Sequence, residues 1–230
     1  GINMILNIFG GVIANAARAI STQVLKGISS ISDRMSAAFA PQATQQYSIG
    51  DQNKFQDLII LSTKLINYLY LLMAVPIALF TPLILEIWLG EIPQYSIEFV
   101  RATLLYGFAR SIHSPLNMSF QCSGKLKLYQ IIELCSLLPS LPLAYILLKI
   151  GLPLYWALLA MAITNFFNNI IITILANKQL QLNIKAFLFN TIIPIMIIGT
   201  CSMISGWLIC SLINNVYLQI ILSISMTGLL

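Results

Sequence analysis

The sequence has very little charge. Only 8% of its 230 residues are Asp, Glu, Lys or Arg, whereas hydrophobic residues make up 58%. Soluble domains carry about 25% charged residues, so the composition excludes a soluble globular domain. Apolar runs long enough to cross a bilayer, about 20 residues, recur along the chain at 65–89, 126–148, 157–175, 187–212 and 216–230. The sequence therefore predicts an all-α fold, a polytopic membrane helix bundle.

Residues that build catalytic or metal centres are also scarce. The chain has one histidine, and its four cysteines, Cys122, Cys135, Cys201 and Cys210, have neither CxxC nor metal-ligand spacing. It contains no Ser–His–Asp grouping, paired-carboxylate motif or phosphate-binding glycine loop, and Gly10-Gly11 reads as a helix–helix turn. The net charge of +5 is spread along the chain, unlike a nucleic-acid-binding patch. We therefore expect no enzymatic activity, metal, cofactor or nucleic-acid partner.

Turn residues and charges divide the chain into eight hydrophobic segments. They cover residues 1–10, 14–40, 56–89, 96–122, 126–149, 152–176, 186–210 and 214–230. Pro76 and Pro82 are expected to kink segment 56–89 and to leave a short terminal helix near the membrane interface. Because the first segment is half a span and the last ends inside an apolar run, we expect a longer protein.

Basic residues are distributed unevenly between the two sets of segment ends. Arg101 and Lys149 lie at one set, against six at the other: Lys54, Lys64, Lys125, Lys127, Lys178 and Lys185. Loops rich in Lys and Arg stay on the cytoplasmic side of a membrane. Loops 41–56, 123–127 and 177–186 are therefore predicted to be cytoplasmic.

Three segments have a polar stripe along one face. At about 100° per residue, segment 14–40 gathers Asn15, Arg18, Thr22, Lys26, Ser29, Asp33 and Ser36 on one side. Segment 96–122 does the same with Tyr106, Arg110, His113, Ser114, Asn117 and Gln121, and segment 126–149 with Tyr129, Glu133, Ser136 and Ser140. Because charged groups are costly in the bilayer core, these stripes are predicted to meet around a polar cavity.

The first two stripes carry an excess of cations. Arg18, Lys26 and Arg110 are predicted to bind an anionic group, because a buried arginine cannot lose its proton and needs an anionic partner. The other residues predicted to line the cavity are Asn15, Thr22, Asp33, His113, Asn117 and Glu133. Simpler roles stay open for some polar groups. Glu133 can pair with a Lys or Arg of a neighbouring helix, His113 can be a hydrogen-bonded bundle histidine, and Asn165, Asn168 and Asn169 can join helices.

Four strings in the first two thirds of the chain carry a family resemblance: NIFGGVIANAARAISTQV, AFAPQATQQYSIGD, LEIWLGEIPQYSIEFVR and CSGKLKLYQI. In this order they resemble bacterial polysaccharide flippases of O-antigen and lipopolysaccharide biosynthesis, in the multidrug/oligosaccharidyl-lipid/polysaccharide exporter superfamily. The resemblance implies the second lobe of a two-lobe MATE-like transporter. Residues 1–176 would form this lobe, truncated at its first helix, and residues 177–230 would add two C-terminal helices, the last one truncated.

The resemblance also implies a function. Such a protein would move an undecaprenyl-pyrophosphate-linked oligosaccharide from the cytoplasmic to the periplasmic leaflet of the bacterial inner membrane by alternating access. Arg18 in NAAR matches a basic position of the family, whereas Thr44, Gln45 and Gln46 stand where a basic residue is expected. Expected partners are the lipid-linked oligosaccharide, membrane lipid and the polysaccharide polymerase machinery.

Three alternatives to the flippase function stay open. A cation-coupled multidrug exporter of the same superfamily would favour acidic cavity residues. A membrane enzyme that acts on lipid-linked sugars would need a long outer loop with catalytic residues. An assembly subunit would use the polar stripes only to pack against partner helices.

Overall fold

A computed structural model of the chain describes residues 1–212 and Gly228, and every regular element between residues 1 and 212 is helical. This confirms the predicted all-α bundle. The elements are α1 (Ile2–Ile49), α2 (Gln52–Leu79), α3 (Thr81–Leu89), α4 (Ser96–Ser123), α5 (Leu126–Leu137), α6 (Ser140–Lys149), α7 (Trp156–Leu180), α8 (Ile184–Phe187), the π-helical turn η1 (Leu188–Ile192) and α9 (Ile193–Leu212). Apart from Gly228, the predicted segment 214–230 lies outside the described residues, as does the side chain of Cys210.

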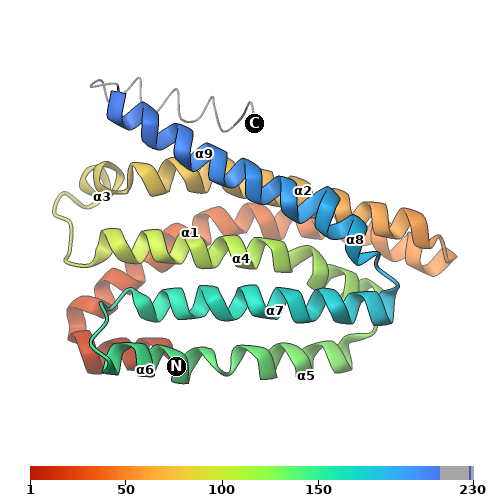
Figure 1. Cartoon of the computed structure of the whole chain (residues 1–230), viewed down its shortest axis with the longest axis horizontal. Helices are drawn as coiled ribbons and strands as arrows, with labels where there is room; N and C mark the ends of the chain where they lie inside the picture. The colour runs from red at the N-terminus through yellow and green to blue at the C-terminus, as the bar shows by residue number, and fades with distance from the viewer. Residues whose placement is uncertain (213–227, 229–230) are drawn as a thin grey trace.

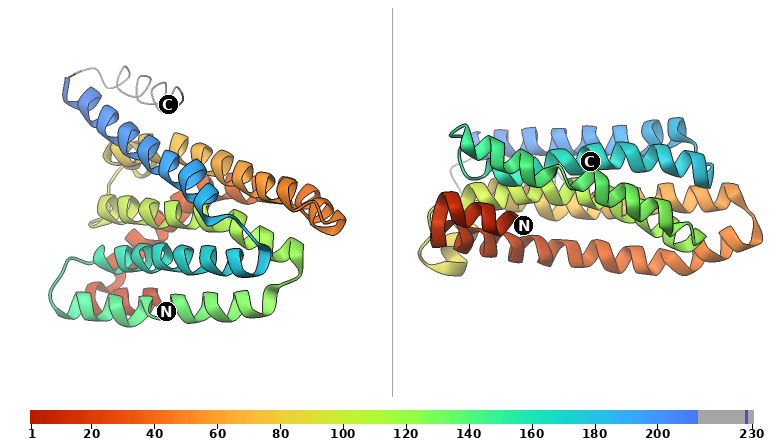
Figure 2. Two further views of the ribbon diagram at one scale, coloured as in Figure 1. Left: turned by 45° about the vertical axis from the view of Figure 1, so that its right-hand side comes forward. Right: turned by 90° about the horizontal axis from the view of Figure 1, so that it is seen from below.

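The long helices lie side by side, with α5 and α6 along one edge of the bundle and α9 along the other (Figure 1). Within the described part, five helical stretches are long and apolar enough to cross a membrane: Ile2–Ile49, Gln52–Leu79, Leu126–Lys149, Trp156–Leu180 and Ile184–Ile209. Helix α4 is not among them because its charged and hydroxyl side chains lower its hydropathy. It packs against α1, α2 and α7 instead, in the middle of the bundle (Figure 2), and most of its hydroxyl groups are buried there.

The three loops that the charge pattern predicts to be cytoplasmic lie at one end of the bundle (Figure 1). Gln52 donates a hydrogen bond to the Leu180 carbonyl, and the Lys125 ammonium donates one to the Gln179 carbonyl. These contacts join the ends of α2, α7 and the connection before α5. The structure therefore confirms that the three loops share one side of the bundle; that this side is cytoplasmic stays a prediction.

The first of these loops is much shorter than predicted. Helix α1 continues through Pro41 to Ile49, and only Gly50 and Asp51 separate it from α2, so most of the predicted loop 41–56 is helical. Packing of Tyr47 against the core on α2 favours this extension. Gly50, with φ 81°, then ends α1 in the left-handed conformation.

Helix α2 starts with a capping aspartate. The Asp51 carboxylate accepts a hydrogen bond from the backbone N–H of Lys54 (3.1 Å), and this bond lowers the pKa of the Asp51 carboxyl.

The other two loops at this end of the bundle are also shorter than predicted. Loop 123–127 is reduced to Gly124 and Lys125, and loop 177–186 to residues 181–183, because α7 continues to Leu180.

Segment 56–89 breaks as predicted, and the break lies at Phe80, between α2 and α3. Pro82 occupies the first turn of α3, where a missing N–H costs little, and Pro76 stays inside α2. The absent N–H of Pro82 leaves the Ala78 carbonyl without its helical partner. The Thr81 hydroxyl donates a hydrogen bond to this carbonyl (3.1 Å).

Two further bends differ in how well the sequence predicts them. Gly11, with φ 62°, turns the start of α1 back, as expected for a Gly-Gly helix turn, and Leu6 packs against the core beside α6 and α7. The predicted single helix over 126–149 is instead divided at Leu138 and Pro139 into α5 and α6. A proline inside an apolar helical run ends the preceding helix here.

Replacing Gly107 of α4 should destabilise the bundle. A Cβ at this position would lie 2.3 Å from both Leu25 Cδ1 and the Tyr70 hydroxyl, where α1, α2 and α4 meet. Gly107→Leu is expected to lower the free energy of unfolding by about 1–3 kcal/mol, the usual cost of overpacking. The matched control is Gly27→Leu, because nothing lies within 4 Å of a Cβ there. Equal thermal unfolding temperatures for the two purified variants in detergent would contradict this close packing.

Candidate functional site

A polar cavity of about 90 Å³ lies among α1, α2, α4 and α5. This volume is large enough to hold several water molecules. The cavity brings together Asp33, Arg110, His113, Asn117 and Glu133, which the sequence analysis places in one cavity. Serine hydroxyls supply most of the remaining polar lining: Ser29, Ser32, Ser111 and Ser114.

Helix α4 forms the centre of this cavity. Arg110, His113, Ser114 and Asn117 are three or four residues apart and therefore share one face of the helix. Buried apolar side chains lie on α4 before and after this polar face, at Phe99 and Leu104 and again at Leu116 and Phe120. The polar groups therefore occupy the middle of α4, between two apolar cores.

Pro115 lies within α4 without breaking it. Because proline has no N–H, the Ser111 carbonyl loses its helical hydrogen bond. The side chain of Asn67, fully buried on α2, donates to this carbonyl (3.4 Å) and accepts a hydrogen bond from the Ser111 hydroxyl (2.7 Å). Asn67 thus satisfies the polar groups that Pro115 exposes, and it fixes α2 against α4.

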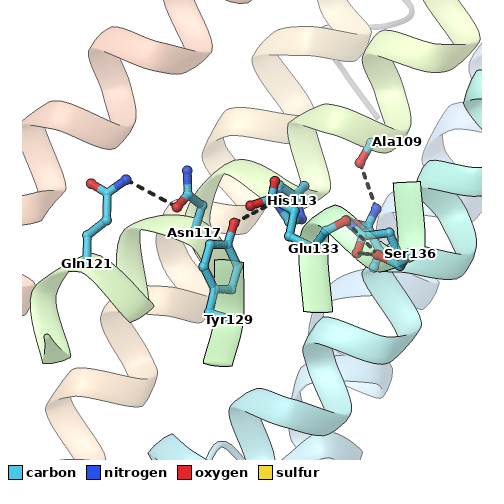
Figure 3. A network of polar contacts seen from close by, with 9 residues as sticks. Ala109, His113, Asn117, Gln121, Tyr129, Glu133 and Ser136 are labelled. Carbon is cyan, nitrogen blue, oxygen red and sulfur yellow. Dashed lines mark hydrogen bonds and ion pairs between the residues drawn. The ribbon is translucent and has the colours of Figure 1, made fainter. Parts of the chain in front are cut away.

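His113 links α4 to α5 (Figure 3). Its Nε2 atom lies 2.8 Å from the Tyr129 hydroxyl and 3.0 Å from Glu133 Oε1. His113 is therefore hydrogen-bonded within the bundle, as one of its two interpretations expects. The partner of Glu133 is this histidine rather than a Lys or Arg, although Arg110 is near enough to attract the carboxylate electrostatically.

Two asparagines of α7, Asn168 and Asn169, join helices, and neither they nor Asn165 line the cavity. Asn168 accepts a hydrogen bond from the Ser136 hydroxyl of α5, and Asn169 Nδ2 donates to the Ala109 carbonyl of α4 (2.7 Å). Asn165 donates to the Met161 carbonyl within α7 itself. The structure thus favours the interhelical role that the sequence analysis leaves open for Asn168 and Asn169.

The predicted anion-binding residues do not share one site. Arg110 lines the cavity, and its guanidinium forms no hydrogen bond or ion pair within residues 1–212. Arg18 Nη1 donates to Thr103 Oγ1 (3.1 Å), seven residues before Arg110 on α4, which is roughly 10 Å along the helix axis. Lys26 is exposed on α1 and is not part of the cavity lining.

Two other predicted lining residues make local contacts instead. Asn15 Nδ2 donates to Asn7 Oδ1 (3.0 Å), and the Thr22 hydroxyl donates to the Arg18 carbonyl (2.8 Å), both within α1. Neither residue lines the cavity. The stripes of α1 and α4 nevertheless meet as predicted, through the Arg18 contact at one end and through the hydroxyls of Ser36 and Ser114, 2.7 Å apart, further along.

Tyr70, Asn67, Ser32 and Ser111 belong to the site, but the sequence analysis does not select them. Asn67 and Tyr70 are three residues apart on α2 and therefore share one face of this helix, so a short polar stripe could have been recognised there. The proline rule points to Ser111, because Pro115 frees the carbonyl four residues earlier. The position of Ser32 beside the stripe of α1 carries no comparable signal.

Asn67→Leu should destabilise the bundle by about 1–3 kcal/mol, since it leaves the Ser111 carbonyl and hydroxyl buried with fewer partners. In a Pro115→Ala background the backbone N–H of residue 115 returns, and the penalty should shrink. The free energy of unfolding in mixed detergent micelles, measured for the four members of this double-mutant cycle, gives the coupling. Strictly additive effects of the two substitutions would show that Asn67 does not compensate for Pro115.

Comparison with known protein families gives one finding. The MatE family profile matches residues 2–146, more than half of the chain and all of the helices that line the polar cavity. No curated protein and no solved structure matches the chain. MatE proteins are transporters rather than enzymes, within the multidrug/oligosaccharidyl-lipid/polysaccharide exporter superfamily. The chain is therefore a multi-pass membrane protein that belongs to the MatE family of transporters.

Proposed function

We propose that this transporter moves a lipid-linked oligosaccharide across the membrane, and that the polar cavity on α4 contacts its head group. The observation that carries the proposal is the cavity lining. Ser29, Ser32 and Asn117 offer hydroxyl and amide groups that match sugar hydroxyls, whereas the hydroxyls of Ser111 and Ser114 already bond to Asn67 and Ser36. Sites for drug-like molecules are instead lined mostly by apolar and aromatic side chains, whereas most of the side chains that line this cavity are polar.

Arg110 would bind the pyrophosphate of the head group. Its guanidinium is exposed and has no hydrogen-bond partner in the described part of the chain, although it lies at the cavity of a membrane-spanning bundle. Arginine keeps its charge there and can offer paired N–H groups to phosphate oxygens. Arg18 and Lys26 lie at other depths on the same stripe of α1, so they would contact the head group at other stages of transport.

The orientation in this proposal follows from the loop charges, and the direction of transport and the partners follow from the resemblance to polysaccharide flippases. The lysine-rich loops would lie in the cytoplasm of a bacterium, and transport would run by alternating access to the periplasmic leaflet of the inner membrane. The lipid tail would stay in the bilayer during transport. The polysaccharide polymerase machinery would then use the translocated oligosaccharide.

Arg110→Gln should lower the rate of oligosaccharide translocation at least about tenfold, the effect of losing one charge-assisted hydrogen bond. Arg110→Lys should retain part of the rate, since it keeps the charge. The measurement uses the full-length protein in proteoliposomes with a fluorescent undecaprenyl-pyrophosphate oligosaccharide and a membrane-impermeant quencher. Lys149→Gln, at an exposed residue of α6, is the matched control. Unchanged translocation in Arg110→Gln would contradict the proposal.

A cation-coupled multidrug exporter is the second candidate, and one observation favours it. The cavity contains two carboxylates, Asp33 and Glu133, against one arginine. The cation excess of the stripes is therefore not reproduced in the cavity, because Arg18 and Lys26 lie elsewhere. Carboxylates at this position suit a cationic substrate.

The two candidates predict opposite responses to the loss of these carboxylates. If the protein exports cationic compounds, Asp33→Asn and Glu133→Gln should each abolish efflux of a cationic dye from cells that express the full-length protein. If it moves an anionic head group, the cells should show no such efflux, and both variants should translocate the oligosaccharide at half the wild-type rate or more. Dye efflux that depends on Asp33 would replace the flippase proposal.

A further inference from the structure

A second, larger cavity lies on the other side of α4. It is an apolar groove of about 770 Å³ between α2, α4, α7 and α9. Its walls carry aliphatic and aromatic side chains such as Leu71, Val75, Leu105, Phe108 and Met203. This groove is distinct from the polar cavity: Tyr70 borders both, and its hydroxyl donates to the Leu104 carbonyl (2.6 Å), so it offers no free donor to the groove.

Helix α9 determines the length of the groove. Gly199 faces Leu71 and Gly206 faces Leu79, so α9 runs in the same direction as α2. The groove follows α9 from Met196 to Trp207, a rise of roughly 16 Å at 1.5 Å per residue. This equals about half of the 30 Å hydrocarbon core of a bilayer. The groove therefore has the depth of one membrane leaflet.

Arg101 lies at one end of this groove, at the level of Ala78 and Trp207. Its Nε atom donates to the Ala78 carbonyl (3.1 Å), which is the carbonyl that Pro82 leaves without a helical partner. The Arg101 side chain is exposed, and its terminal nitrogens form no hydrogen bond or ion pair with the side chains and backbone that the structure describes. The break at Phe80 thus orients a cation with free donors over an apolar groove.

These features match the chemistry of a membrane lipid. An apolar groove inside a bilayer is filled by hydrocarbon, and its volume lies within the range of ligand sites. Tryptophan is common at the membrane interface. Trp207 therefore indicates that the end of the groove at Arg101 lies at this interface. A cation at that end favours a phosphate with net negative charge.

We propose that this groove binds a resident anionic glycerophospholipid of the bilayer, with one acyl chain between α2 and α9 and the phosphate on Arg101. This site is separate from the polar cavity, and the proposal does not depend on which substrate is transported. The lipid would cover apolar surface between α9 and the rest of the bundle, and it would thereby hold α9 in place.

Native mass spectrometry of the full-length protein can test this site, with dioleoyl phosphatidylglycerol and dioleoyl phosphatidylcholine as probes. We expect one tightly held phosphatidylglycerol per chain. Arg101→Gln should reduce the preference for phosphatidylglycerol about tenfold, the effect of one charge-assisted hydrogen bond. Thr200→Trp, which fills the groove, should reduce retention of both lipids.

Two matched controls separate the groove from the general lipid-facing surface. Lys149→Gln removes an exposed cation elsewhere, and Ile197→Trp adds the same ring to an exposed position of α9 outside the groove. Both should bind lipid like the wild type. Because Arg101 is exposed, Arg101→Gln should fold normally. This variant therefore still tests the proposal if Thr200→Trp fails to fold.

Several outcomes would overturn the proposal. Unchanged lipid preference in Arg101→Gln would remove the role of the arginine. Displacement of the lipid by soluble glycerol phosphate would show that the phosphate alone is recognised. Displacement by an equimolar polyprenyl phosphate would assign the groove to an isoprenoid chain. None of these results bears on translocation in Arg110 variants, so the two proposals can fail separately.

Discussion

The structure depends on the need to satisfy polar groups inside a bundle that lipid surrounds. Helix α4 concentrates this problem, because it carries an arginine, a histidine, several hydroxyls and the carbonyl freed by Pro115. Each neighbouring helix supplies partners to it: Arg18 and Ser36 from α1, Asn67 from α2, Glu133 and Tyr129 from α5, and Asn169 from α7. A polar group left without a partner in this environment would cost several kcal/mol. The central position of α4 follows from this cost.

Helix α4 consequently separates two different environments. On one side its stripe faces α1 and α5 and forms the polar cavity with Arg110. On the other side it forms an apolar groove with α2 and α9, which ends at Arg101. Tyr70 lies between the two and directs its hydroxyl to an α4 carbonyl. One helix thus contributes to both kinds of surface.

Prolines illustrate how far sequence rules extend. The rule that a proline frees the carbonyl four residues earlier correctly identifies the carbonyls that need another donor. It does not say whether the helix breaks there or continues. Near Pro82 the helix breaks and Arg101 takes up the Ala78 carbonyl; at Pro115 the helix continues because Asn67 compensates. Pro41 leaves α1 intact, which makes the predicted loop 41–56 mostly helical. The response depends on donors from other helices, and these are unknown until the helices are packed.

The sequence by itself determined that this chain is an all-helical membrane protein with polar stripes that must meet, because composition and helical spacing depend only on residue order. It also identified the residues of the cavity that lie on those stripes, such as Asp33, Arg110 and His113. Only the tertiary structure decided which of the predicted cations lies at the cavity. Arg18 and Arg110 each lie on the polar stripe of their own helix. The way α1 packs along α4 places Arg18 beside Thr103 and leaves Arg110 at the cavity without a hydrogen-bond partner among the described residues. Relative helix displacement is set by packing, which a single-helix pattern does not contain.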